Sequence, residues 1–164
     1  MQHAKSFFYK EIMTINGKNY NNILLVFALE SEAGNQFDNY NKIFVGIGKV
    51  KATYNLTKAI QKIKPDLIIN LGTAGSTTFD RGSVVNCSRF IQRDMDVRAL
   101  GFEKFETPLS GEPVLLEYGL NIKNLPNGIC GSGDQFEMEH INPEYNVIDM
   151  EAFALAKVSE QEKI

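Results

Sequence analysis

Cysteine and histidine are scarce in this sequence, with two of each among 164 residues. Cys87 and Cys130 are too few for a disulfide framework and lack the spacing of metal ligands. His3 and His140 stand alone and form no zinc-binding motif. We therefore expect no metal ion or other cofactor, and two reduced thiols in the core of a cytosolic protein.

Long apolar runs and runs of one charge are also missing. The longest apolar runs, such as 23–29, are far too short to span a bilayer. Residues 1–10 contain no apolar signal-peptide core. The net charge is -3, and lysine and arginine are spread along the chain, which argues against a nucleic-acid surface or a basic membrane anchor. These absences predict a cytoplasmic protein without nucleic-acid or membrane partners.

The composition that remains is typical of a soluble globular protein. Hydrophobic residues make up 43% and charged residues 23% of the chain. A chain of this length can form one domain with a substantial core. We expect an N-terminal extension or short hairpin over residues 1–20, turning at Asn16–Gly17, and one domain over residues 21–164.

Buried strands alternate with helices along this domain. Apolar residues at helical spacing predict two helices. The first opens at Gly46–Lys49 and is ended by Pro65, and the second covers residues 151–162. This alternation predicts an α/β fold, a single domain with a mainly parallel, twisted central sheet flanked by helices. The predicted strands are 22–29, 42–47, 66–71, 83–91, 128–132 and 146–150.

Ligands of such sheets bind where the strands end, and a Gly-rich turn and several carboxylates fall there. Gly72–Gly75 would let a ligand approach the backbone closely, although it could equally be a plain turn. Gly46–Lys49 is not a Walker loop and reads first as a tight turn into a helix. Glu32 could be ordinary surface, and Glu151 a favourable charge in the first turn of a helix. None of these motifs decides the function by itself.

Their order along the chain is more specific than any one of them. Together they resemble the bacterial 5'-methylthioadenosine/S-adenosylhomocysteine nucleosidases and, more broadly, the nucleoside phosphorylase superfamily, over residues 23–158. The motifs that carry the resemblance are Ala28-Leu29-Glu30-Ser31-Glu32, Gly46-Ile47-Gly48-Lys49-Val50, the run from Pro65 to Gly75, Asp94-Met95-Asp96-Val97 with Gly101-Phe102, Ser132-Gly133-Asp134-Gln135-Phe136, and Asp149-Met150-Glu151.

The resemblance implies roles for residues around the sugar. Glu32 corresponds to the residue that positions and activates the attacking water, and Ile47 lies near the sugar. Met150 would pack on the ribose while Glu151 accepts hydrogen bonds from its hydroxyls. Carboxylates suit this reaction, because breaking an N-glycosidic bond builds positive charge on the sugar.

Other implied roles concern the base and the partner subunit. Thr73, Ala74 and Gly75 would line the ribose and base pocket, and Phe136 would stack on the purine. The resemblance also implies a homodimer in which the segment 94–102 completes the partner's pocket. The implied activity is hydrolysis of adenine ribosides to free adenine and the thio-ribose, in purine and methionine salvage.

The sequence departs from the family pattern at three places. Arg98 replaces a small residue, and Glu137 replaces an apolar one beside Phe136, which puts the exact purine in doubt. The family continues with a last strand, whose Asp protonates the leaving purine, and a last helix; neither follows Ile164 here. Leaving-group protonation contributes about 10²–10⁴-fold to such rates. We therefore expect the 164-residue chain to turn over weakly or not at all.

Two alternatives remain open. A phosphate-dependent purine nucleoside phosphorylase would need arginines to bind phosphate. The corresponding places here hold the acidic loop Glu30–Glu32 and the neutral Asn70, so water is favoured as the nucleophile. A non-catalytic nucleoside-binding relative is the second alternative, and the missing acid is its main support. An unrelated function on the same fold is disfavoured, because the matches include site residues as well as core strands.

Overall fold

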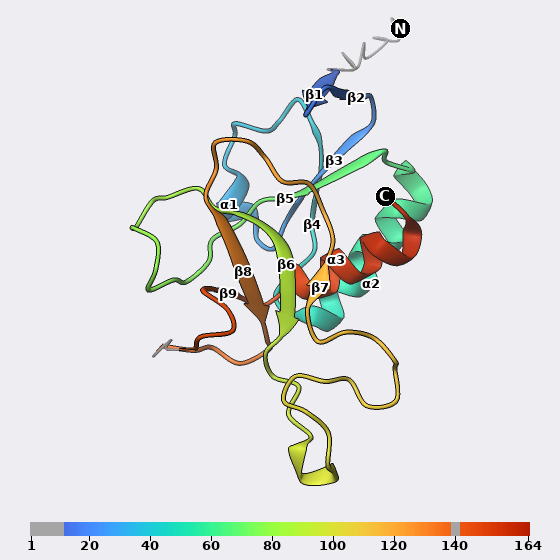
Figure 1. The fold of residues 1–164 in the computed structure, drawn as a ribbon. Helices are drawn as coiled ribbons and strands as arrows, with labels where there is room; N and C mark the ends of the chain where they lie inside the picture. Colours follow the sequence, from blue (N-terminus) through green and yellow to red (C-terminus); the bar gives the residue numbers. More distant parts are fainter. Residues whose placement is uncertain (1–11, 139–141) are drawn as a thin grey trace, which may run out of the picture.

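The computed structural model describes residues 12–138 and 142–164 and is shown in Figure 1. His3, His140 and most of the predicted N-terminal extension lie outside these residues. Beyond them, Met13–Ile15 (β1) and Lys18–Tyr20 (β2) pair antiparallel about a turn at Asn16 and Gly17. Both turn residues have positive φ, as a tight hairpin turn requires.

The first of two larger sheets is parallel and is built around β3 (Ile23–Phe27). β4 (Asn41–Phe44) and β5 (Leu67–Asn70) flank β3 on its two sides. Every residue of β3 is buried, because a central parallel strand is covered on both faces. Its continuous apolar run therefore identified it correctly from the sequence.

The second sheet has four strands in the order β7-β6-β8-β9. β6, β8 and β9 are parallel, whereas the short β7 runs antiparallel along the edge. Gly75, which follows β5, exchanges two backbone hydrogen bonds of 2.9 and 2.8 Å with Ile148 of β9, and this pairing joins the sheets. The strands are β6 (Asn86–Gln92), β7 (Leu116–Glu117), β8 (Asn127–Ser132) and β9 (Val147–Asp149).

The predicted α/β class with mainly parallel pairing is confirmed, but two details differ from the prediction. The strands divide between two ladders instead of forming one, because among residues 12–138 and 142–164 only Gly75 and Ile148 pair across the junction. β7 was not predicted, since a two-residue strand leaves no pattern in the sequence. The strand predicted at 83–91 begins at Asn86, after residues that do not pair.

Two helices cover one face of β3 and lie side by side (Figure 1). α2 (Lys49–Ile63) follows β4, and α3 (Ala152–Glu162) follows β9. Leu56 of α2 and Leu155 of α3 are both buried against the same face of the strand. The other face of β3 is closed by β2 and by the region around the single-turn helix α1 (Glu30–Ala33). A short 3-10 helix, Arg98–Leu100, follows β6.

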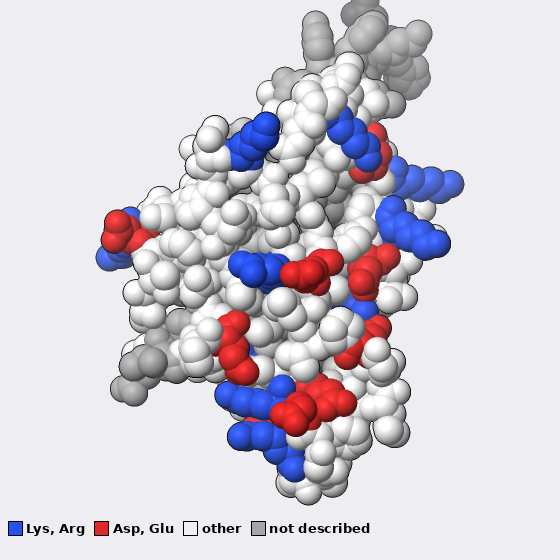
Figure 2. Space-filling model, in the orientation of Figure 1, with Lys and Arg blue, Asp and Glu red and all other residues white. Residues whose placement is uncertain are grey.

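Charges are mixed on the surface. Figure 2 shows basic and acidic side chains next to one another across the visible face, with no broad area of one sign. Within the described part of the chain, no helix is long and apolar enough to cross a membrane.

The packing of α2 against β3 gives a direct test of the fold. Leu56 is 0% exposed at the centre of this contact, so Leu56→Ala should lower the free energy of unfolding by about 2–5 kcal/mol. Chemical denaturation monitored by circular dichroism would measure the loss. Thr53→Ala, on the exposed side of the same helix, should change stability by about 0.5 kcal/mol or less. Equal losses in both variants would contradict the packing described.

Candidate functional site

The site lies where segments leave the carboxyl ends of the strands. Contacts between these segments, described below, bring carboxylates from both sheets together at one edge. Two segments lie on either side and are called after the parts of a nucleoside that their residues are predicted to contact. The sugar-side turn is Gly46–Lys49, between β4 and α2, and the base-side segment is residues 133–137, after β8.

Glu32 is held by four hydrogen bonds from two segments. Its Oε2 accepts from the backbone N–H groups of Ala28 and Leu29, both at 3.0 Å. Its Oε1 accepts from the N–H and the hydroxyl of Thr73, also at 3.0 Å each. A side chain at Gly72 would approach the same oxygen at 3.3 Å, so glycine leaves room for the carboxylate. The predicted residues Glu32 and Thr73 are therefore in direct contact.

The rest of the Gly-rich turn is fixed from its far end. Gly75 pairs with Ile148 of β9, two residues before Met150. Ala74 lies between the two anchored positions and is exposed. The turn therefore runs from Glu32 to the end of β9 with part of its surface open to a ligand.

Glu151 reaches across to the start of α2. Its Oε1 accepts a 2.8 Å hydrogen bond from the N–H of Gly48 in the sugar-side turn, next to Ile47. Gly48 has φ 91°, and a Cβ there would lie 3.0 Å from Asp134 Oδ1, so the position needs glycine. Glu151 is thus more than a favourable charge on its own helix.

Burial raises the pKa of Glu151, and the negative charges of Asp149 and Glu32 raise it further, against the opposing hydrogen bond from Gly48. The effect of Glu32 is evidence that these two predicted carboxylates share one electrostatic environment. Charge of one sign gathered in this way is unfavourable to the fold and typical of functional sites.

Asp149, in contrast, stabilises the start of α3. Its Oδ2 accepts from the N–H of Ala152 at 2.7 Å, and its Oδ1 accepts from the hydroxyl of Ser132 at 2.5 Å. Ser132 is fully buried and in turn accepts from the N–H of Phe153 at 2.8 Å. Asp149 and Ser132 therefore fix the helix from which Glu151 projects.

A ring of three residues joins the sugar-side turn to the base-side segment. Asp94, just after β6, accepts from Lys49 Nζ at 2.5 Å and from the N–H of Asp134 at 2.8 Å. Asp134 Oδ1 accepts from the N–H of Lys49 at 2.8 Å, which closes the ring. Burial raises the pKa of Asp94, but the hydrogen bonds from Lys49 and Asp134 outweigh it and lower the pKa overall.

Arg93 holds the base-side segment from the other side. Its Nη2 donates to the carbonyl oxygens of Gly133, at 3.3 Å, and of Gln135. Its Nη1 forms a 3.1 Å ion pair with Glu137, the residue at which the sequence departs from the family pattern. The negative charge of Glu137 is therefore paired with Arg93.

The apolar residues predicted for the site are open to solvent. Phe136 is 83% exposed and Ile47 is 49% exposed, while Met150 is partly buried. No described contact joins the Phe136 ring to the other predicted residues. Its segment is held instead, through Asp134 and through Arg93. A flat ligand could cover these surfaces.

Lys49, Asp94, Asp134 and Arg93 are the residues whose contacts sequence reasoning did not anticipate. Three of them occur in the recognised motifs, and their position after strands was the only available signal. Arg98, the other departure, pairs with Asp96 at the surface, away from this ring.

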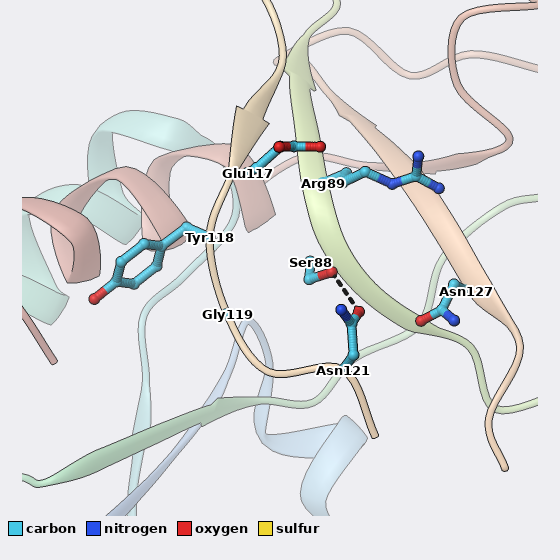
Figure 3. Close-up of a pocket in the computed structure, with 7 residues that line it drawn as sticks. All are labelled: Ser88, Arg89, Glu117, Tyr118, Gly119, Asn121 and Asn127. Carbon is cyan, nitrogen blue, oxygen red and sulfur yellow. Dashed lines mark hydrogen bonds between the residues drawn. The ribbon is translucent and has the colours of Figure 1, made fainter. Parts of the chain in front are cut away.

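A separate hollow lies near the opposite end of β8. It has a volume of about 550 Å³ and is lined by polar groups including Arg89, Glu117 and Asn127. Figure 3 shows that Ser88 and Asn121 are hydrogen bonded to each other at 2.8 Å within it. None of the site carboxylates lines this hollow, so it is separate from the candidate site. Among the described residues, no group of three or more histidine, cysteine, aspartate or glutamate side chains is arranged to hold a metal ion.

The raised pKa of Glu151 predicts an unusual pH dependence of stability. The folded protein binds this proton more tightly than the unfolded chain, so stability falls as pH rises above the ordinary pKa of 4.5 and through the raised value. Glu151→Gln removes the buried charge and should raise the free energy of unfolding near pH 7 by about 1 kcal/mol or less, given solvent screening. The gain should shrink as the pH falls through the raised value and should be largely lost by 4.5. Denaturant titrations at several pH values would measure it.

Glu103→Gln is the matched control, because Glu103 is an exposed glutamate outside the site. This substitution should change the free energy of unfolding little at any of these pH values. A pH-independent difference between wild type and Glu151→Gln would mean that Glu151 carries no buried charge.

Comparison with known proteins points to one family. The model of the phosphorylase superfamily matches residues 40–164. Among curated proteins, the chain is 30% identical over 139 residues to a 5'-methylthioadenosine/S-adenosylhomocysteine nucleosidase from Staphylococcus epidermidis, covering 73% of this chain and 61% of that protein. A nucleosidase of the same name from a Geobacillus species is 30% identical over 137 residues, covering 71% of this chain and 59% of that protein. The chain thus spans about 60% of the length of these relatives.

Solved structures show the same fold. The Campylobacter jejuni 5'-methylthioadenosine/S-adenosyl homocysteine nucleosidase superposes with a TM-score of 0.75 at 20% identity, covering 87% of this chain and 80% of that one. A futalosine hydrolase mutant of Helicobacter pylori gives a TM-score of 0.73 at 18% identity, covering 87% of this chain and 84% of that one. At these identities the likeness concerns the fold.

Proposed function

The chain belongs to the phosphorylase superfamily, and on that basis we propose that the protein hydrolyses the N-glycosidic bond of adenine ribosides of the 5'-methylthioadenosine/S-adenosylhomocysteine type. The products would be free adenine and the thio-ribose. The named nucleosidases among its curated relatives support this substrate class. We further propose a cytoplasmic role in purine and methionine salvage.

The environment of Glu32 is the observation that carries the choice of water over phosphate. Converging backbone N–H groups and a hydroxyl, such as those of Ala28, Leu29 and Thr73, would suit a phosphate. The Glu32 carboxylate already accepts all four of their hydrogen bonds. A phosphate dianion would have to displace this carboxylate and then lie beside it.

The cations described near the site do not offset that repulsion. Lys49 is paired with Asp94, and Arg93 with Glu137. The residue at the end of β5 is the neutral Asn70. The geometry therefore favours a neutral nucleophile, water, over a phosphate anion.

The proposed chemistry uses the two glutamates on the sugar. Glu32 orients water and takes one of its protons as the water oxygen bonds to the sugar, and the rotatable hydroxyl of Thr73 is the partner most readily exchanged for that water. The bond from the sugar to the purine breaks in the same step, and the leaving purine takes up a proton from solvent at the open base surface. Glu151 keeps one oxygen on Gly48 N–H and offers the other to the ribose hydroxyls. Both negative charges stabilise the oxocarbenium-like transition state, in which the sugar becomes positive.

The base and the rest of the sugar are assigned to the open surfaces. Phe136 stacks on the purine, and Ile47 and Met150 pack against the ribose. Ala74 and Gly75 present backbone at the floor of the pocket. The ring of Phe136 is largely exposed in the free protein, and ligand binding would bury it.

Nucleoside binding without turnover is the second candidate. The carboxylates of Asp94, Asp134 and Asp149 all accept hydrogen bonds from N–H or O–H donors of neighbouring segments. These contacts give each of the three a structural role, which supports binding without turnover. Measuring nucleoside affinity and adenine release on the same sample separates the two candidates.

Glu32→Gln tests the proposed nucleophile activation. With the protein in excess over 5'-methylthioadenosine, single-turnover release of adenine should slow by about 10²–10⁴-fold, since Gln cannot deprotonate water. Affinity for the nucleoside should be nearly unchanged by calorimetry. Glu30→Gln, an exposed glutamate two residues earlier, should keep the wild-type rate. The sugar product should be the free thio-ribose.

Adenine release that requires added phosphate and gives a sugar 1-phosphate would overturn the proposal. Tight nucleoside binding with no adenine release by the wild type would favour the second candidate.

We propose a homodimer in which residues 94–102 meet the partner's site. This segment carries Leu100, which is 73% exposed, together with Met95 and Phe102. Exposed apolar side chains beside a pocket are typical of an interface. Leu100→Glu should convert a dimer to a monomer in sedimentation velocity, whereas Leu109→Glu, at a 92% exposed leucine outside the segment, should not. A monomeric wild type at micromolar concentration would contradict the proposal.

A further inference from the structure

The ring formed by Lys49, Asp94 and Asp134 connects three segments that are distant in sequence. The ring consists of three hydrogen bonds, and each of the three residues takes part in two of them. Asp94 supplies one carboxylate oxygen to Lys49 Nζ and the other to the N–H of Asp134. One carboxylate therefore spans the sugar-side turn and the base-side segment.

The ring is shielded from solvent. The side chains of Lys49 and Asp94 are 15% and 18% exposed, against 60% and 43% for the neighbouring pair Arg98 and Asp96. Ion pairs that are largely removed from water hold their geometry better than surface pairs, which contribute little. Asp94 and Asp96 both follow β6, so the contrast lies in the surroundings of the two pairs.

Both joined segments carry groups of the proposed site. The sugar-side turn provides Gly48 N–H, which holds Glu151, and the exposed side chain of Ile47. The base-side segment provides Phe136, two residues after Asp134. Any change in the ring changes the distance between the sugar-binding and base-binding groups.

We infer that Asp94 is a positioning residue that sets the spacing between the sugar-side turn and the base-side segment, so that a ligand with both a ribose and a purine is bound as one unit. Asp94 acts through Lys49 and Asp134 and does not touch the ligand. The inference rests on the proposed function for the identity of that ligand.

A ligand that spans both segments should depend on Asp94 more than a ligand that touches only one. Asp94→Asn keeps the shape but leaves one acceptor oxygen for two donors and turns an amide N–H₂ toward Lys49 or Asp134. Affinity for 5'-methylthioadenosine should fall about tenfold, as expected for a lost charge-assisted hydrogen bond. Affinity for adenine alone should change by about twofold or less. Calorimetry on both ligands measures the ratio.

Lys49→Met removes the same ion pair from its other end and guards against misfolding of the first variant. It should give the same selective loss, and the double variant should lose no more than either single one, because the residues act as a unit. Asp38→Asn is the control: it breaks the surface ion pair of Asp38 with Lys42, outside the proposed site and outside the segment 94–102, and should leave both affinities unchanged.

Amide hydrogen exchange tests the positioning without any ligand. In Asp94→Asn the N–H groups of Gly48 and Asp134 should exchange about tenfold faster, and in Asp38→Asn at the wild-type rate. Unchanged exchange at both amides, or equal losses of nucleoside and adenine affinity, would overturn the inference. If the wild type bound no 5'-methylthioadenosine, the proposed function would fail, and the exchange rates would still decide whether Asp94 holds the two segments.

Discussion

The start of α2 holds two carboxylates that come from the other sheet. Gly48 N–H binds Glu151, which follows β9, and Lys49 N–H binds Asp134, which follows β8. A helix start has unpaired N–H groups and a partial positive charge, so it favours such partners. The two sheets pair directly only through Gly75 and Ile148 among the described residues. The candidate site therefore depends on these helix-start contacts for its shape.

The same arrangement gathers negative charge at one edge. Asp134 is offset by its place in the ring with Lys49, and Asp149 by the N–H groups of α3. Glu151 is half-buried beside two carboxylate neighbours, Asp149 and Glu32, and its pKa is raised despite hydrogen bonds from the backbone of Gly48 and Met150. Residues that cost stability in this way persist where function needs them. Among the site carboxylates, Glu151 is the one least explained by the fold alone.

The sequence predicted the parts of this structure that depend on local pattern. The continuous run of β3 and the apolar stripe of α2 are visible without any tertiary information. β7 and the division into two ladders were not, because strand pairing partners and two-residue strands leave no local periodicity. Glu32 and Thr73 were both singled out from family motifs, and the structure brings them into contact, although their catalytic roles stay predictions. The ion pair of Lys49 with Asp94 could not be foreseen, since nothing local joins residues 45 positions apart.

The position of Glu32 also bears on how one fold can serve different nucleophiles. A cluster of N–H donors binds whichever anion is present, and a carboxylate attached to the same chain is always present at high local concentration. Glu32 is four residues from Ala28 and so occupies the donors without waiting for a ligand. A free phosphate would compete against this internal anion and also against the charge of Glu151. Water suffers neither penalty, and it gains from the negative charge, because a carboxylate can take its proton. In the proposed mechanism, the internal carboxylate would thus exclude one nucleophile and activate the other by the same contact.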